Sequence, residues 1–166
     1  MTVFVYDTGM LIALEDRRNR SAAALHRWAR AQTHPPVIPL PVLAQAWRPA
    51  PWTALTAVTA ESVIFGTEAR HGVLCAVCSA GHLSEDGKRA GKLMGKAAIP
   101  EKKRPDAVDA LAVITAARHA ESIIITSDPD DITAYRDALD PQPGVPLVLP
   151  VTEIDRFAQG ELKALL

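Results

Sequence analysis

Short apolar runs recur along the chain, and between them apolar residues return every three or four positions. The first run, residues 2–6, is β-branched and aromatic without polar alternation, which is typical of a strand covered on both faces of a sheet. Similar runs predict strands at residues 37–38, 62–65, 123–126 and 147–149. Because strands and helices alternate, we expect an α/β protein, a three-layer α/β/α sandwich with a central, mainly parallel sheet.

Helices between these runs are predicted from apolar spacing and from capping residues. Thr8 is a suitable cap for a helix over residues 9–14, and Ser21 for one that runs to about residue 32. Ser84 precedes an amphipathic helix over residues 85–94, which Gly95 ends. Residues 73–77 fit either a strand or a buried helix, so segment 52–81 is left open. The remaining predicted helices cover residues 41–48, 106–120, the stretch from the turn at 128–131 to about 139, and 152–166.

Length and composition fit a single domain over residues 1–166, with 48% hydrophobic residues available for a core. The 18 basic and 19 acidic residues give a net charge of −1, so there is no global basic field for non-specific nucleic-acid binding. Two cysteines do not make a disulfide framework, and no apolar stretch approaches the roughly 20 residues that span a bilayer. We therefore expect a cytoplasmic protein with no membrane contact.

Three aspartates, Asp7, Asp109 and Asp128, lie far apart in the sequence but at corresponding places in the predicted fold. Asp7 and Asp128 follow predicted strands, and Asp109 lies in the first turns of a predicted helix, one turn after Asp106. Ligands of open parallel sheets bind beyond the carboxyl ends of the strands. Carboxylates that converge there raise one another's pKa unless a cation neutralises them, and Mg²⁺ or Mn²⁺ suits oxygen ligands. The alternative is that these acids only cap helices and begin turns.

A carboxylate-held metal ion suits phosphodiester hydrolysis, because it lowers the pKa of a bound water and stabilises the leaving oxygen. The basic loop over residues 96–104 leads into the acidic helix, so Lys102, Lys103 and Arg104 are candidates for contact with RNA phosphates. Arg48 is a further candidate. For all four, the alternative is an ordinary solvated side chain.

Four motifs occur in the chain in the order typical of one family: residues 5–14, 41–48, 106–110 and 126–131. In this order they resemble the motifs of PIN-domain proteins, and most closely those of the bacterial VapC-type toxin branch. The resemblance implies a Mg²⁺- or Mn²⁺-dependent endoribonuclease that cuts single-stranded or structured RNA by means of a metal-activated water. It also implies a frequent homodimer and, for toxins, an antitoxin protein that blocks the site.

Carried over to this sequence, the resemblance makes Asp7, Asp109 and Asp128 the catalytic metal ligands. Thr126 corresponds to the hydroxyl residue beside the last acid, and Asp106 and Asp131 are supporting acids. The chain departs from the family at Gln45, where a glutamate is usual. An amide oxygen can still bind a metal or its water, but it brings no negative charge. The alternative function is therefore a catalytically degenerate PIN-like module that binds RNA or a protein.

His71, Cys75, Cys78 and His82 have the side chains that bind zinc, at close spacing. Intervals of four, three and four place them on one stripe if the segment is helical, and a single straight helix cannot enclose a tetrahedral ion. A strand and loop would weaken this objection. We therefore expect buried cysteines, histidines that are hydrogen-bonded or exposed, and no nucleophilic role for either cysteine.

Overall fold

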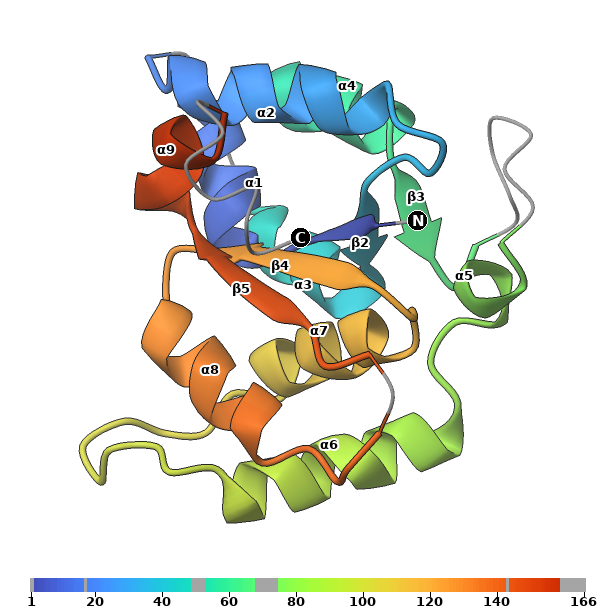
Figure 1. Ribbon diagram of the computed structural model, residues 1–166, viewed down its shortest axis with the longest axis vertical. Coiled ribbons are helices and arrows are strands. Elements are labelled where there is room, and N and C mark those ends of the chain that lie inside the picture. The colour runs from blue at the N-terminus through green and yellow to red at the C-terminus, as the bar shows by residue number, and fades with distance from the viewer. Residues whose placement is uncertain (1, 17, 49–52, 68–74, 143, 159–166) are drawn as a thin grey trace.

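A central sheet of five parallel strands forms the middle layer of the protein (Figure 1). The computed structural model describes residues 2–16, 18–48, 53–67, 75–142 and 144–158. The strands are β1 (Val3–Tyr6), β2 (Val37–Pro39), β3 (Val63–Phe65), β4 (Ser122–Thr126) and β5 (Leu147–Pro150), in the spatial order β3-β2-β1-β4-β5. All four neighbouring pairs are parallel. The predicted parallel sheet is confirmed.

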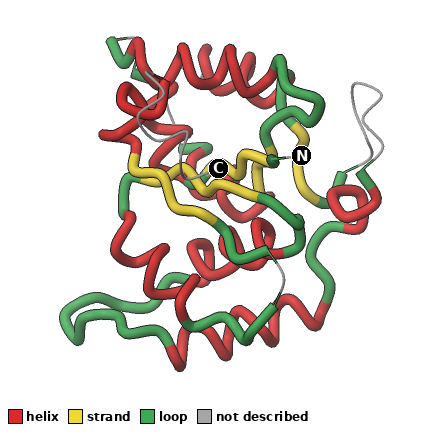
Figure 2. Tube along the Cα trace, viewed as in Figure 1, coloured by secondary structure: helices red, strands yellow, loops and turns green. Residues whose placement is uncertain are grey.

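Helices cover both faces of the sheet, as the tube view shows (Figure 2). Seven of them are α1 (Thr8–Glu15), α2 (Arg20–Arg30), α3 (Leu40–Ala46), α4 (Thr53–Ala60), α5 (Ala76–Ala80), α6 (Ser84–Lys96) and α7 (Ala107–Ala117). The chain continues with α8 (Pro129–Asp137), the short 3₁₀ turn η1 (Val151–Glu153) and α9 (Ile154–Ala158). The three-layer α/β/α sandwich expected from the sequence is thus observed.

The strand side chains divide between two apolar cores because successive residues point to opposite faces of a strand. Phe4 and Tyr6 of β1 pack with helices α1, α2, α4 and α9, whereas Val3 and Val5 pack with α5 to α8. All four of these side chains are buried. Burial on both faces explains why the first strand has no polar alternation.

Several predicted helix boundaries are wrong because a different residue provides the cap. The Asp7 side chain, and not Thr8, caps α1 by accepting from the Thr8 N–H at 2.6 Å. Asn19 caps α2 in place of Ser21. Gly95 lies inside α6, whose N-cap is Leu83.

Other differences concern whole segments. Helix α4 was not predicted, because its Ala- and Thr-rich sequence has no distinct apolar stripe. Within the ambiguous residues 73–77, the first two lie outside the described residues, and α5 begins at Ala76. The expected terminal helix is observed as η1 and α9, and residues 159–166 lie outside the described part.

The strand order reverses between β1 and β4, which are neighbours in the sheet although a long stretch of chain separates them. Ligands of open parallel sheets bind beyond the carboxyl ends of the strands at such a reversal. Asp7 follows β1 directly, and Asp128 comes two residues after β4. Among the described residues, no helix is long and apolar enough to cross a membrane.

Candidate functional site

Asp7 is fixed at the end of β1 by donors from two other elements. Its Oδ1 accepts from the Thr8 N–H, and its Oδ2 accepts from the Thr126 hydroxyl at 2.8 Å. The Asp7 side chain is buried, and desolvation raises its pKa although these hydrogen bonds favour the charged form. Thr126 in turn accepts from the Asp128 N–H at 2.9 Å. Thr126, the last residue of β4, therefore orients both the Asp7 carboxylate and the backbone of the loop that carries Asp128.

Gln45 of α3 joins two further elements to this edge. Its side-chain oxygen accepts from the Thr8 hydroxyl, and its Nε2 donates to Asp106 Oδ2 at 3.2 Å. Asp106 is the N-cap of α7, with its Oδ1 accepting from the Val108 N–H at 2.7 Å. The Tyr135 hydroxyl of α8 accepts from the Asp106 N–H at 2.8 Å. Gln45 thus connects Thr8 of α1 with the N-cap of α7, and its amide donates a hydrogen bond to the Asp106 carboxylate.

Asp109 differs from the other acids because no partner offsets the negative charge of its carboxyl group among the described residues. It lies in the first turn of α7, and in the described part of the chain no hydrogen bond or ion pair engages its carboxyl group. Burial, and after it the charges of Asp7, Asp106, Asp128 and Asp131 in that order of size, together raise its pKa to about 7. The structure therefore holds Asp109 within the field of all four other predicted acids.

Lys103 bridges the two outer acids. Its ammonium lies 2.9 Å from Asp128 Oδ2 and 3.0 Å from Asp131 Oδ1. Hydrogen bonds to these carboxylates raise the pKa of Lys103 above its usual value. Lys103 was expected to contact RNA, but here it is already paired with acids of the site.

The other predicted RNA contacts are exposed cations. Lys102 and Arg104 flank Lys103 in the loop before α7, and both are exposed. Arg48 is also exposed, and its Nε donates to the Gln45 backbone carbonyl at 3.1 Å. We call the edge of the sheet that carries Asp7, Asp106, Asp109, Asp128 and Asp131 the acidic edge. The three cations remain accessible to a polyanion beside it, and none has a contact that identifies a ligand.

Comparisons with protein-family models, curated proteins and solved structures find no match for this chain. The resemblance to PIN-domain proteins therefore stays a prediction from the motifs, and the chemistry of the site has to be argued from its own residues.

The donor set at this edge fits a hard divalent cation. Its charged ligand atoms are all carboxylate oxygens, which Mg²⁺ and Mn²⁺ prefer, and Asp109 has an uncompensated charge that a cation would relieve. However, the carboxylate oxygens lie further apart than the ligands of a bound ion would. Among the described residues, no three carboxylates bring ligand atoms within 4.8 Å of one another, since the one set that does so is His34, Cys75 and Cys78.

Sequence reasoning missed two residues that shape the site. Thr8 was interpreted as a cap, but its hydroxyl contacts Gln45. Tyr135 was not singled out, although it is buried and holds the Asp106 backbone. Neither residue carries a local signal of its role, because each depends on an element that is distant in the sequence.

Proposed function

We propose that the protein is a PIN-like, metal-dependent endoribonuclease that hydrolyses RNA phosphodiesters. The observation that carries the proposal is Asp109, a carboxyl group without a hydrogen-bond partner in the described residues, with its pKa raised by burial and by four surrounding acids. Structural helix caps do not need this arrangement, whereas a cation site does.

Asp7, Asp109 and Asp128 would hold Mg²⁺ or Mn²⁺, which supplies positive charge and Lewis acidity for attack on phosphorus. Thr126 keeps Asp7 and the Asp128 backbone in a fixed relation. The amide of Gln45 keeps Asp106 in place without adding charge.

Exposed cations beside the acids would bind the RNA backbone. Lys102, Arg104 and Arg48 can neutralise phosphates locally. Such local contacts are needed because a chain with a net charge of −1 has no overall positive field to attract RNA. Lys103 has to exchange its two carboxylate partners for a phosphate, or remain with them and leave the RNA to its neighbours.

The toxin role is part of the same proposal. A toxin of a type II pair would have an antitoxin that covers the acidic edge, and it would often form a homodimer. The cheapest observation is a small reading frame adjacent to the gene. Co-expression of that product should suppress RNA cleavage, and cleavage that persists in a stable complex would contradict this assignment.

The direct test is cleavage of a single-stranded RNA by the purified protein with Mn²⁺ or Mg²⁺. Asp109→Asn is the best inactive variant, because the Asp109 carboxyl has no hydrogen bond within the described residues whose loss would disturb the fold. Asp130→Asn is the matched control, since Asp130 is an exposed acid in the nearby first turn of α8. We expect cleavage by wild type and Asp130→Asn, and none by Asp109→Asn or with EDTA. Equal cleavage in all four samples would exclude the proposal.

A second candidate function is a PIN-like binding module without catalysis. Two observations favour it: Gln45 provides an amide where the family has an acid, and Lys103 already neutralises Asp128 and Asp131. This alternative predicts that RNA is bound and remains intact in the same assay, with binding unaffected by EDTA.

A further inference from the structure

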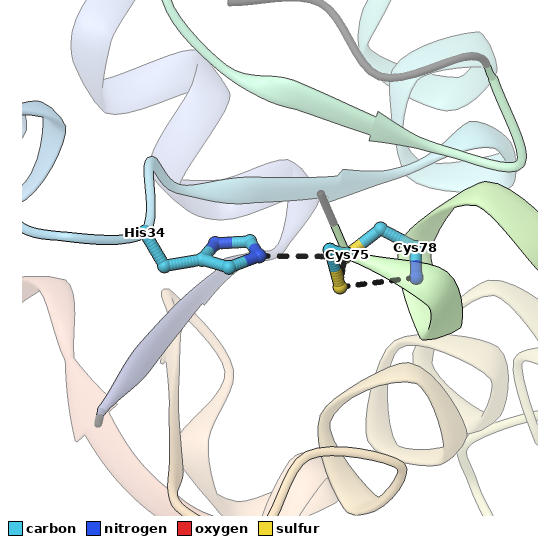
Figure 3. A group of neighbouring side chains, drawn as sticks. All are labelled: His34, Cys75 and Cys78. Atoms are coloured by element: carbon cyan, nitrogen blue, oxygen red, sulfur yellow. Dashed lines mark hydrogen bonds between the residues drawn. The ribbon is translucent and has the colours of Figure 1, made fainter. Parts of the chain in front are cut away.

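A second group of metal-binding side chains lies away from the acidic edge. Cys75 is the N-cap of α5, Cys78 lies within α5, and His34 precedes β2. The ligand atoms of these three residues all lie within 4.8 Å of one another. Figure 3 shows the His34 ring pointing toward the two cysteines, which come from a segment distant in the sequence.

The residues of this group face one another in the interior. The His34 Nε2 is 3.6 Å from the Cys78 sulfur, and the Cys75 sulfur is 2.6 Å from that of Cys78. His34 is 2% exposed and Cys78 is 1% exposed, while Cys75 is half-buried. Two thiols and an imidazole are therefore gathered where water has little access.

His119, which follows α7, is a fourth donor at the edge of the group. Its Nε2 lies 3.9 Å from the Cys78 sulfur, and its ring packs edge-on against that of His34 at 5.9 Å. Its side chain is buried. The His119 nitrogen is not one of the three ligand atoms that lie within 4.8 Å of one another.

His34 is oriented as a metal ligand would be. Its Nδ1 lies 2.7 Å from the Pro35 carbonyl oxygen. A carbonyl only accepts, so Nδ1 carries the proton and Nε2 presents its lone pair to Cys78. Histidine ligands of metals are commonly fixed by a backbone carbonyl in this way.

We propose that Cys75, Cys78, His34 and His119 form a structural zinc site. Two thiolates and two imidazoles are a common tetrahedral donor set for Zn²⁺, and the burial of the group fits a closed site without an open coordination position. In a tetrahedron with zinc–sulfur bonds of about 2.3 Å and zinc–nitrogen bonds of about 2.0 Å, ligand atoms lie roughly 3.3 to 3.8 Å apart. The distance between His34 and Cys78 already agrees, and the two sulfurs would separate by about 1 Å on binding.

The proposed histidine ligands, His34 and His119, are not the two histidines that lie near the cysteines in the sequence, His71 and His82. His82 donates or accepts at Thr115 Oγ1, 2.8 Å away, and its ring lies against Phe65. His71 lies outside the described residues. The objection that one helix cannot enclose the ion does not apply, because the four proposed ligands come from three separate segments.

Such a site would join the segment before β2, the start of α5 and the end of α7. The Cys78 carbonyl also accepts from the Gly66 N–H at 2.8 Å, which attaches α5 to the end of β3. The zinc ion would thus fix a region that does not include any residue of the proposed RNA-cleaving site, and the two proposals fail or stand independently.

The test is a titration of the reduced, metal-free protein with Co²⁺, followed by displacement with Zn²⁺. Thiolate-to-cobalt charge-transfer absorption and the visible bands of tetrahedral cobalt report sulfur ligation directly, so Co²⁺ bound by aspartates does not give this signal. We expect one such site per chain, complete displacement by Zn²⁺, and a lower melting temperature when a chelator removes the metal.

Matched variants identify the ligands. Cys75→Ser, at a half-buried position, and His119→Ala should each weaken Zn²⁺ binding roughly tenfold or more, whereas His82→Ala should leave it unchanged. Reduced wild-type protein with both thiols free that gives no charge-transfer band would overturn the proposal. So would a site lost in His82→Ala and retained in His119→Ala, or a band that persists undiminished in Cys75→Ser.

Discussion

Asp109 shows how a single carboxyl group can be unfavourable for folding and useful for binding. Its pKa of about 7 lies well above the value of about 3.9 in an unfolded chain, so the folded protein binds its proton more tightly. Stability from this group is therefore present at low pH and is lost as pH rises toward 7. A bound cation would reverse that loss.

Asp109→Asn should remove this pH dependence in protein treated with EDTA. Wild type and variant should be about equally stable near pH 4, and at pH 8 the variant should be more stable by about 1 kcal/mol, since solvent screens a partly exposed carboxyl. Urea denaturation at several pH values measures the difference, with Asp130→Asn as the control. A variant that is less stable than wild type at pH 8 would show that the folded protein stabilises the charged Asp109 carboxylate.

Gln45 provides a test of the metal site, because it is an amide at the position where the resemblance leads us to expect a glutamate. Its amide donates to Asp106, so Gln45→Glu replaces a hydrogen bond with a repulsion. We expect the metal-free variant to lose about 1 kcal/mol or more of stability and to bind Mn²⁺ more tightly than wild type. Unchanged Mn²⁺ affinity, measured by calorimetry, would place Gln45 outside any metal site.

At the scale of elements, the acidic edge depends on the close approach of α1 to the end of β4. A Cβ at Gly9 would lie 2.1 Å from the Ser127 Oγ and 2.6 Å from the Ser127 backbone nitrogen. The backbone contact cannot be relieved by a side-chain rotation. This glycine therefore allows the helix after Asp7 to pack beside the loop that carries Asp128.

Gly9→Ala should accordingly lower the free energy of unfolding by about 1–3 kcal/mol. Gly91→Ala is the matched control, because Gly91 lies in α6 with nothing within 4 Å of the added Cβ. There the reduced entropy of the unfolded chain should stabilise the protein by about 0.5–1 kcal/mol. Equal and small effects of the two substitutions in thermal unfolding would mean that the α1 to β4 contact is not tight.

Across the whole molecule, the sequence predicted those features that arise from local patterns. Continuous apolar runs predicted all five strands, since β1, β2 and β4 are buried throughout and β3 and β5 in part. The positions of Asp7 and Asp128 followed from strand ends in a parallel sheet. Features that depend on distant partners were not predictable. The hydroxyl of Tyr135 reaches Asp106 from another helix, and His34 lies 44 residues from Cys78.

The central claim is that the carboxyl edge between β1 and β4 holds a divalent cation. Titration with Mn²⁺, followed by electron paramagnetic resonance of the free ion, tests it most directly, because Mn²⁺ favours oxygen over sulfur ligands. We predict that wild type, Asp130→Asn and Cys75→Ser bind Mn²⁺ alike, and that Asp109→Asn binds it roughly tenfold or more weakly. Wild-type protein that binds no Mn²⁺, or an Asp109→Asn variant that binds it as tightly as wild type, would contradict the claim.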